Sequence, residues 1–515
     1  MRAKPFVCTA AEAVRHIQDG MTVATSGFRY AGTAESLLAA LGSRHAQTGS
    51  PRQLTLVFSS AQGNNDGTGL DHLAHPGLLK RIVGGYFGVT RRLAAMVQND
   101  GVEAYNWPQG VITRLYHSIA ARQPGVITKI GLNTFVDPRC GGGRLSGRTA
   151  ELLNSIVVLN GETYILYNSF PIHACLLRLT SADAHGNLSS EREAVKLEWL
   201  PLAMATRNSG GVVIAQVEKI LTGRLHPRAV DVPAHLVDYI VQAECPETQH
   251  RQCVNEQFNA AYNGDEASAR ACAEIKRDVA GQLIAARATK FLREGEVVNI
   301  GSGLPELVGS VLRATEAQVR VHITMESGVN GGIPAAAPDF GLATDPQSII
   351  RQDDQFNYYQ GGGLDTAVLG FAEVDGDGNV NVSKFGGRVI GCGGFIDIAQ
   401  SAKRVLLCGT FNAKGLTVDI QGDGIAVVSN GAIRKLVNRV EQVTFSGQEA
   451  RKQRQEVWLI TERCVMRLSA DGWVVTEVTA GVDLEKDVLQ QAGCKLSVEE
   501  PLRVAPLDLT RARFV

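Results

Sequence analysis

The stretch TMESGVNGG, Thr324–Gly332, places one acidic side chain between an apolar strand and a glycine-rich turn. Polar and apolar residues alternate in VRVHITME (319–326), so Glu326 is the last side chain on the polar face of an expected strand and projects at its carboxyl end. The glycines that follow leave backbone N–H groups unshielded. A carboxylate beside bare backbone donors is a candidate for a functional site, although a solvated loop glutamate is the open alternative for this stretch alone.

Three further glycine-rich turns lie in the same half of the chain, each before or after an apolar strand: NIGSGLPE (299–306), YYQGGGLD (358–365) and FGGRVIGCGGFIDI (385–398). Together these turns could form a surface that a long ligand approaches closely. None of them is a complete dinucleotide fingerprint, because Glu306 replaces the last glycine of GxGxxG and no ribose-binding acid follows at the expected spacing. A nicotinamide cofactor is therefore disfavoured.

Histidine and cysteine side chains offer no alternative catalytic set. His72 and His75 are three residues apart, as a metal-binding pair on a helix would be, but no third ligand is identifiable and a satisfied surface pair is favoured. His322 shares the expected strand face with Glu326 and is interpreted as a buried, hydrogen-bonded histidine. Cys392 lies inside a glycine turn without an adjoining base, so we interpret it as a small packing residue. No metal is expected.

The composition is that of an ordinary globular protein: 515 residues, 44% hydrophobic and 20% charged, with a formal net charge of −1. No basic block is present that would neutralise nucleic-acid phosphates, so a DNA or RNA partner is unsupported. The N-terminal residues lack the apolar core of a signal peptide, no run of about 18 apolar residues could span a bilayer, and the ten cysteines include no CxxC pair. We expect a cytoplasmic protein with reduced cysteines and no membrane contact.

The elements that must position the candidate residues alternate between helical and strand patterns along the chain, which is typical of α/β folds with mostly parallel sheets. A polar stretch, residues 246–278, is interpreted as a linker between an N-terminal domain, 1–245, and a C-terminal domain, 279–515. Ligands of open α/β sheets lie beyond the carboxyl ends of the strands, and clefts between two such domains are favoured sites. A site at the end of the strand that carries Glu326 agrees with both tendencies.

The second half of the chain repeats features of the first. Two stretches align in sequence, AVRHIQDGMTVATSG (13–27) and ATKFLREGEVVNIGSG (288–303). Each is expected to lead into a helix with a glutamate in its first turn, Glu35 or Glu306. ADAHGNLS (182–189) is matched by VDGDGNVNVS (374–383). Two matches in the same order indicate a duplicated α/β unit, and the alternative is that all strand-turn-helix units look alike. Glu306 is interpreted as a support for its helix N-terminus.

With these residues assembled, the chain resembles the class I coenzyme A transferases over nearly its whole length, in particular the single-chain short-chain acyl type that includes acetate and propionate CoA-transferases. DGMTVATSGFRYAGTAE (19–35) is similar to the family's first signature, with Ser26 for the first glycine and Ala34 for the proline of GGFxxxGxP. NWPQG (106–110) resembles the PQG element, in which Trp107 is interpreted as a packing residue. MESGVNGG fits the ExGxxG variant of the second signature, and QFNYYQGGGLD, NVNVSKFGG, GCGGFIDI and ITERCVMRL also resemble that group.

The resemblance implies two related open α/β domains, the fused α and β halves of a CoA-transferase, each with a mostly parallel sheet flanked by helices. It makes Glu326 the catalytic nucleophile. The acyl pocket and oxyanion donors would come from Ser26, Gly27, Phe28, Gly32, Gln109, Gly391 and Gly393. Coenzyme A would be bound by Gly301, Gly303, Gly328, Asn330, Gly361, Gly362, Gly363, Gly393 and Gly394.

The implied activity is transfer of CoA from a short-chain acyl-CoA to free acetate, propionate, butyrate or acetoacetate, in ping-pong steps through a glutamyl-CoA thioester on Glu326. With the ordinary glutamate pKa of about 4.3, that carboxylate would be ionised at neutral pH and would need no general base. CoA is then a substrate, no cofactor or metal is required, and a homo-oligomer, a dimer or tetramer, is expected. Two alternatives stay open on the same site: hydrolysis of acyl-CoA, and a non-catalytic ligand-binding or regulatory protein.

Overall fold

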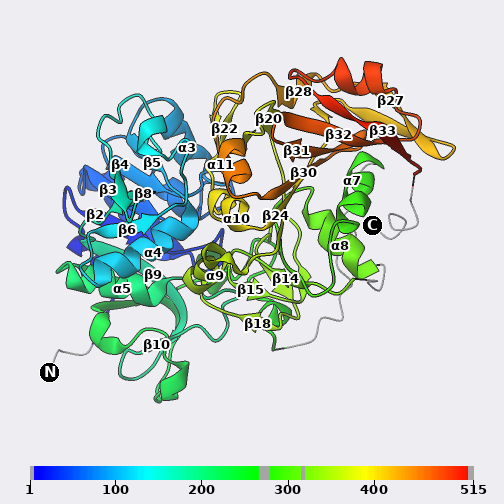
Figure 1. The fold of residues 1–515 in the computed structure, drawn as a ribbon. Helices are drawn as coiled ribbons and strands as arrows, with labels where there is room; N and C mark the ends of the chain where they lie inside the picture. Colours follow the sequence, from blue (N-terminus) through cyan, green and yellow to red (C-terminus); the bar gives the residue numbers. More distant parts are fainter. Residues whose placement is uncertain (1–4, 266–278, 315–318, 508–515) are drawn as a thin grey trace.

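The structure, a computed structural model, describes residues 5–265, 279–314 and 319–507. Figure 1 shows two halves side by side, each built on a large sheet with helices packed against it. The first sheet takes its strands from residues 6–242 and the second from residues 297–505. This is the mixed α/β architecture with large parallel sheets that the sequence predicted.

The first sheet is parallel throughout, except for one short strand at its side. In sheet order it contains β1 (Phe6–Val7), β12 (Tyr239–Gln242), β11 (Val212–Ile220), β9 (Ala174–Ala182), β2 (Thr22–Thr25), β3 (Leu54–Phe58), β4 (Leu79–Gly84) and β5 (Glu103–Asn106), and β10 (Leu188–Ser189) pairs with β9 in the antiparallel sense. The helices of this half are α1 (Ala10–Ala13), α2 (Glu35–Thr48), α3 (Arg91–Gln98), α4 (Gln109–Ala120), α5 (Trp199–Asn208) and α6 (Pro246–Gln249). The strand β9, ACLLRLTSA, is buried at every position, as a central strand covered on both faces must be.

The second sheet has a parallel centre with antiparallel pairs on either side, and its last strand pairs with its neighbour in the parallel sense. In sheet order it contains β18 (Ser348–Ile349), β15 (Val329–Asn330), β14 (His322–Thr324), β13 (Val297–Ile300), β19 (Thr366–Leu369), β24 (Arg404–Cys408), β30 (Glu456–Ile460), β31 (Cys464–Ser469), β32 (Gly472–Thr479) and β33 (Ser497–Ala505). The helices of this half are α7 (Val279–Thr289), α8 (Glu306–Ala314), α9 (Gln352–Tyr358), α10 (Phe395–Ser401) and α11 (Gly447–Lys452). The strand that carries the candidate acid is shorter than its sequence pattern predicts, because β14 begins at His322 rather than at residue 319.

Both halves also contain smaller groups of paired strands. The first half has a three-stranded antiparallel sheet of β6 (Gly125–Thr128), β8 (Glu162–Asn168) and β7 (Asn154–Leu159). The second half has β16 (Ile333–Pro334) with β17 (Ala343–Thr344), β21 (Val380–Asn381) with β20 (Glu373–Asp375) and β29 (Leu436–Val437), β22 (Lys384–Phe385) with β23 (Arg388–Val389), β25 (Asn412–Ala413) with β28 (Ile433–Arg434), and β26 (Thr417–Gln421) with β27 (Gly424–Ser429).

The two large sheets share a block of five parallel strands in the same order. The block is β3–β2–β9–β11–β12 in the first half and β14–β13–β19–β24–β30 in the second. In both halves the helix that connects the first two strands of this block along the chain starts with a glutamate, Glu35 in α2 and Glu306 in α8. The common order supports the interpretation that the sequence repeat reflects a duplicated unit.

The second sequence match is also a structural match. The carboxylate of Asp183 accepts hydrogen bonds from the backbone N–H of His185 (2.8 Å) and Asn187 (3.0 Å) and from the Asn187 amide (3.0 Å). Asp375 does the same with Asp377 (3.1 Å) and Asn379 (3.0 and 3.1 Å). The repeated DxxxN spacing therefore encodes the same loop twice.

The part of the predicted linker that the structure describes, 246–265, packs against the second half. The backbone N–H groups of Val254 and Asn255 donate to Asp339 at 2.7 and 3.4 Å, and Asp345 N–H donates to the carbonyl of Ala261 at 3.0 Å. Residues 266–278 of that linker lie outside the described residues. The boundaries 1–245, 246–278 and 279–515 stay predictions.

One hydrophobic cluster crosses from one half to the other. Met325, Val329, Leu342, Cys392 and Ile396 of the second half belong to the same buried cluster as the core side chains of the first. Because these residues flank the candidate acid and the glycine turn at 391–394, packing between the halves fixes both segments at their interface.

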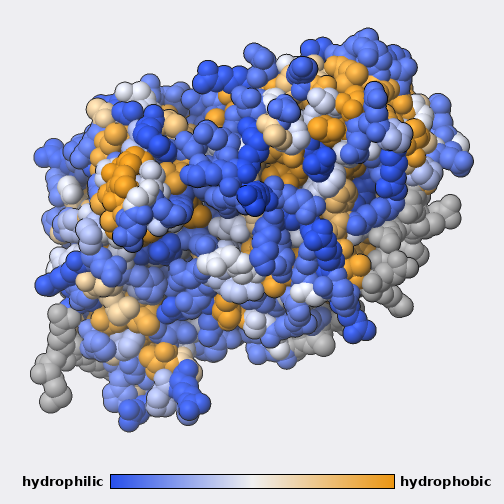
Figure 2. All heavy atoms as spheres, in the orientation of Figure 1, coloured by the Kyte–Doolittle hydropathy of each residue, from blue (hydrophilic) through white to orange (hydrophobic). Residues whose placement is uncertain are grey.

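The face seen in Figure 2 is mainly hydrophilic, with hydrophobic side chains gathered over the small sheet β6–β8–β7. Ile127, Leu152, Val158 and Leu159 are exposed there. No helix within the described parts of the chain combines the length and hydropathy needed to cross a bilayer.

Candidate active site

A cavity of about 300 Å³ lies between the two halves, at the carboxyl ends of strands from both sheets. Phe28 and Arg29 come from the turn after β2, Ser60 from the turn after β3, and Tyr86 from the turn after β4. Gly301 follows β13 on the opposite wall. Open α/β sheets bind ligands at this edge, and the cavity lies where the sequence predicted the cleft.

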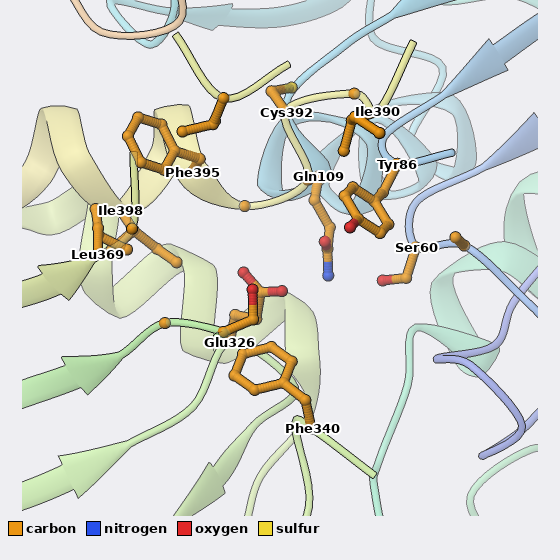
Figure 3. A pocket seen from close by; sticks show the side chains of 18 of the residues that line it. Ser60, Tyr86, Gln109, Glu326, Phe340, Leu369, Ile390, Cys392, Phe395 and Ile398 are labelled. Carbon is orange, nitrogen blue, oxygen red and sulfur yellow. The ribbon is translucent and has the colours of Figure 1, made fainter. Parts of the chain in front are cut away.

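Glu326 lies two residues beyond the end of β14 and lines this cavity, with its carboxylate directed inward (Figure 3). Among the described residues none donates a hydrogen bond to this carboxylate. A Cβ atom at Gly394 would lie 2.2 Å from Glu326 Oε2, so a side chain at position 394 would displace the acid. Met325 and Ser327 on either side are buried, and the Ser327 hydroxyl donates to the carbonyl of Gly341. The acid is therefore held by its neighbours in the chain while its oxygens stay unpaired.

The expectation of an ordinary glutamate pKa at this position is wrong. Burial, with a smaller contribution from the nearby Asp397 carboxyl, raises the pKa of Glu326 to about 7. Removal from water disfavours the charged form, and a second acid in the same region adds like-charge repulsion. At neutral pH the acid is consequently divided between its protonated and ionised forms.

Asp397, in the first turn of α10, is a second buried acid beside the cavity. Its Oδ2 accepts a hydrogen bond from Gly110 N–H at 3.0 Å, and its Oδ1 accepts one from the Gln360 amide at 2.8 Å. Arg114 donates in turn to Gln360 Oε1. Burial raises the pKa of Asp397 to about 7, against the lowering effect of these donors. The network ties the start of α4 in the first half to α10 in the second.

Gln109 is the first residue of α4, and its side chain extends into the cavity toward Glu326 (Figure 3). Its backbone N–H donates to the carbonyl of Gly393 at 3.0 Å, which anchors it across the interface. Its side-chain Nε2 is buried and has no hydrogen-bond partner among the residues that the structure describes. Buried amide groups without partners are uncommon and costly, so this N–H₂ group is a donor available to a ligand in the cavity.

Three of the four backbone N–H groups in the glycine turn 391–394 already have acceptors, and two of these acceptors belong to the first half. Gly391 N–H donates to Ser383 at 2.9 Å, Cys392 N–H to Asn106 Oδ1 at 2.8 Å, and Gly393 N–H to the carbonyl of Gly85 at 2.8 Å. These three groups are not free to stabilise an oxyanion, contrary to the expectation for this turn. Gly394 N–H has no recorded acceptor among the described residues, and Gly394 lines the cavity beside Glu326.

The structure brings together some of the predicted site residues. Those that line the cavity are Phe28, Gln109, Gly301, Glu326, Gly391, Gly393 and Gly394. Those that lie outside its lining are Ser26, Gly27, Gly32, Gly303, Gly328, Asn330, Gly361, Gly362 and Gly363.

Each residue outside the lining faces another part of the protein or solvent. Gly27 lies against Thr33 and Gln62, whereas Gly32 lies against Leu197. Gly328 approaches the backbone of Ile350. The amide of Asn330 donates to the Gly328 carbonyl at 3.0 Å. Ser26 is fully buried, and the turn at 361–362 is exposed.

Sequence reasoning missed several residues that line the cavity, among them Arg29, Ser60, Tyr86 and Asn299. Three of them follow a parallel strand of the first half, and Asn299 belongs to β13 of the second. Their proximity to strand ends was the available signal, because the carboxyl ends of parallel strands meet at one edge.

The secondary candidates take structural roles. Trp107 is buried against Tyr167 in an edge-to-face contact, as predicted. His72 Nε2 contacts Glu35 Oε1 at 2.6 Å, so this histidine is paired with a carboxylate of the protein. The Glu306 carboxylate accepts from Gly303 N–H at 2.7 Å and supports the start of α8. His322 is exposed and lies outside the cavity lining, so its interpretation as a buried histidine is wrong.

Cys392 lines the cavity, and burial raises the pKa of its thiol well above the ordinary value. A thiol that stays protonated is a poor nucleophile. This agrees with a packing role.

Comparisons with known proteins converge on one family. A family model described as coenzyme A transferase matches residues 7–243. The chain is 38% identical to caffeate CoA-transferase of Acetobacterium woodii, over 94% of this chain and 93% of that protein. It is 36% identical to acetate CoA-transferase YdiF of Escherichia coli K12, over 94% of this chain and 91% of that protein. The crystal structure of an acyl-CoA transferase from E. coli O157:H7, described as a thioester complex with CoA, superposes with a TM-score of 0.90 at 34% identity, covering 99% of this chain and 96% of that one.

Proposed function

The chain belongs to the class I coenzyme A transferases of the single-chain acetate type, and on that premise we propose that it moves CoA between short-chain acids through a glutamyl-CoA thioester on Glu326. The observation that carries this proposal is the unpaired carboxylate of Glu326 inside the cavity, against Gly394 and facing the unpartnered amide of Gln109. A related enzyme whose structure is described as a thioester complex with CoA supports the same intermediate.

The proposed reaction preserves the thioester free energy by keeping it on the enzyme. The ionised Glu326 attacks the carbonyl carbon of the acyl-CoA, the C–S bond breaks, and a mixed anhydride and CoA thiolate form. The thiolate then attacks the glutamyl carbonyl, the anhydride C–O bond breaks, and the first acid leaves as its carboxylate. A second acid repeats these steps in reverse and regenerates free Glu326.

Two donors in the cavity are suited to stabilise the tetrahedral oxyanions of these steps. They are the Gln109 amide, which has no partner, and Gly394 N–H, which has no recorded acceptor among the described residues. One preorganised donor of this kind is worth roughly a hundred- to thousandfold in rate.

The enclosed position of Glu326 supports transfer over hydrolysis. The same burial that raises its pKa limits the access of water to the thioester. The raised pKa also means that only the ionised fraction of the free enzyme can attack, so turnover should increase as the pH rises through about 7.

Intact-mass analysis tests the intermediate. After incubation with acetyl-CoA and no acceptor acid, we expect the protein to gain the mass of one CoA less one water, at a peptide that contains Glu326. Acetate should remove this adduct, and Glu326→Gln should never form it. Exchange of CoA by a protein that stays unmodified would overturn the double-displacement mechanism, and rapid acetate release without an acceptor would favour the hydrolase.

The relatives do not identify the acid substrate, because one protein named for caffeate and one named for acetate are similar to this chain at nearly the same sequence identity. Acetate, propionate, butyrate and acetoacetate remain the proposed set. A homo-oligomeric state, a cytoplasmic location and independence of any metal or cofactor stay predictions.

A further inference from the structure

Two aromatic rings separate the cavity that holds Glu326 from a second, smaller space. The smaller space measures about 10 Å³, about the volume that one water molecule requires, against about 300 Å³ for the cavity. Phe28 and Phe340 border both spaces, together with Arg29. The centroids of the two phenyl rings are 6.5 Å apart, and their planes are inclined at 38°. This aromatic pair therefore stands between the cavity and the space behind it.

The backbone around the aromatic pair holds the rings in place. Phe28 N–H donates to the carbonyl of Ala31 at 2.7 Å, and Ala31 N–H donates back to the carbonyl of Phe28 at 3.0 Å. The edge of the Phe28 ring lies against Gly341, where a Cβ atom would be 2.3 Å from Phe28 Cε1. Gly341 also has a φ of 96°. A glycine is needed at this position because the ring approaches the backbone so closely.

The aromatic pair is tied to the segment that carries the proposed nucleophile. Ser327, the residue after Glu326, donates a hydrogen bond from its hydroxyl to the carbonyl of Gly341, the residue after Phe340. Figure 3 shows the Phe340 ring next to Glu326, and both side chains line the cavity. An acyl group that reacts at Glu326 would therefore begin beside this ring.

The space behind the aromatic pair leads away from solvent. Of the described residues that border it, none is exposed. The fully buried ones are Phe28, Ala31, Gln252, Cys253, Asp339 and Leu342. CoA has a long pantetheine arm and a nucleotide, which need far more room than this end of the cavity offers. Only the acyl part of a substrate can therefore point toward the aromatic pair.

Two polar side chains that border the smaller space already have partners. Asp339 accepts a hydrogen bond from Val254 N–H at 2.7 Å. The Gln252 amide donates to the carbonyl of Arg192 at 2.9 Å, and its oxygen accepts from Asn259 N–H at 2.8 Å. A hydrocarbon chain beside these groups would leave their hydrogen bonds in place, so no polar group of a ligand is needed there.

We infer that Phe28 and Phe340 limit the chain length of the acid substrate, and that the space behind them joins the acyl pocket when either ring is removed. The substrate class is a straight-chain aliphatic monocarboxylic acid, in agreement with the acetate, propionate and butyrate proposed above. One methylene group in an apolar pocket changes kcat/KM by roughly 10- to 200-fold, so a fixed wall sets a sharp limit. This inference rests on the proposed function, since it assigns specificity within the same cavity.

Butyrate and hexanoate are matched probes, since they carry the same carboxylate and differ by two methylene groups. With acetyl-CoA as donor, we expect the wild-type kcat/KM for hexanoate to lie about tenfold or more below that for butyrate, because the longer chain meets the aromatic pair. In Phe340→Ala the ratio of hexanoate to butyrate should rise by about tenfold or more. Phe28→Ala should shift the ratio in the same direction. Mass spectrometry of the two acyl-CoA products measures both rates.

Phe385→Ala is the matched control. Phe385, in β22, also lines the cavity but does not border the smaller space. This variant should leave the ratio of hexanoate to butyrate as in the wild type, and an equal rise would contradict a specific role of the aromatic pair. Phe340→Leu keeps an apolar side chain and should raise the ratio by less than Phe340→Ala, which gives a second reading if the alanine variant does not fold. Thermal melting reports folding, and the ratio of two acids on one protein sample cancels a loss of active enzyme.

Three further results would overturn the inference. The wild type could use hexanoate as well as butyrate, or the ratio could stay unchanged in folded Phe340→Ala and Phe28→Ala. Ile398→Ala could raise the ratio instead, which would place the acyl chain along the wall of Leu369 and Ile398 (Figure 3). The CoA adduct on Glu326 is measured from acetyl-CoA without an acceptor, so its absence in the wild type would count against the proposed function and not against the aromatic pair.

Discussion

Two glutamates withdrawn from bulk solvent, the fully buried Glu198 and the partly exposed Glu326, occupy contrasting places in the two halves. Glu198 directly precedes α5 in the first half and accepts a hydrogen bond from the Ser59 hydroxyl at 2.5 Å. Glu326 follows β14 in the second half, faces the cavity and has no donor among the described residues. Burial raises the pKa of each to about 7. At the place before α10 that corresponds to Glu198, the second half has Gly394, which leaves room for the Glu326 carboxylate.

The contrast separates burial from reactivity. Both acids lie largely out of contact with bulk water, and both are harder to ionise as a result. Glu198 has a fixed hydroxyl partner and lies outside the cavity lining, so its burial serves the contact between α5 and the turn after β3. Glu326 has open oxygens and space in front of them. A raised pKa alone would not have distinguished the two.

The largest effect should come from replacing each acid by its amide. Glu326→Gln removes the nucleophile, and we expect CoA transfer to fall by about 10⁴-fold or more. Glu198→Gln keeps a carbonyl oxygen for the Ser59 hydroxyl and should lower turnover by less than about tenfold. Steady-state assays with acetyl-CoA and a labelled acid measure both. Equal losses in the two variants would erase the functional distinction between the halves.

A smaller effect should follow from the donor that the first half contributes. Gln109→Leu keeps the backbone contact to Gly393 and removes the unpartnered amide, and we expect kcat to fall by roughly a hundred- to thousandfold. The Michaelis constant for acetyl-CoA should change much less, because the oxyanion exists only in the transition state. Gln62→Leu, a buried glutamine that pairs with Thr25 and lies outside the lining, is the matched control. A rise in KM with an unaltered kcat would assign Gln109 to substrate binding instead.

The smallest effect should be a shift of the pH profile. The pKa of Glu326 is raised first by burial and then by Asp397, so activity needs deprotonation and should rise with pH through about 7. Asp397→Asn removes the like charge, lowers the pKa of Glu326 and should move the acid limb of kcat/KM to lower pH. The variant keeps one of the two hydrogen bonds that now reach Asp397, so a loss of rate at all pH values is expected as well. A limb that stays in place, or moves to higher pH, would contradict the electrostatic link.

Particular residues show how far sequence reasoning reached. The periodicity around β14, the glycines after it and the collinear motifs were enough to single out Glu326, and all of these are local in the chain. The same reasoning placed Gln109 and the turn 391–394 near the site, where they lie. It also assigned Gly303, Gly328 and Gly361 to the site, although these glycines face other parts of the protein or solvent. A glycine marks a backbone conformation or a close approach, but it does not say which neighbour approaches.

By itself the sequence determined the α/β class, the repeated unit and the acid at the end of its strand, because periodicity, turn residues and motif spacing act over short stretches of chain. Tertiary structure decided the rest. The raised pKa of Glu326 and the Gln109 amide, which has no partner within the described ranges, both depend on segments far apart in the sequence. Asp397 and Gly110, for example, are 287 residues apart and meet through one hydrogen bond. Charges and unused donors are properties of surroundings, and only folding brings those surroundings together.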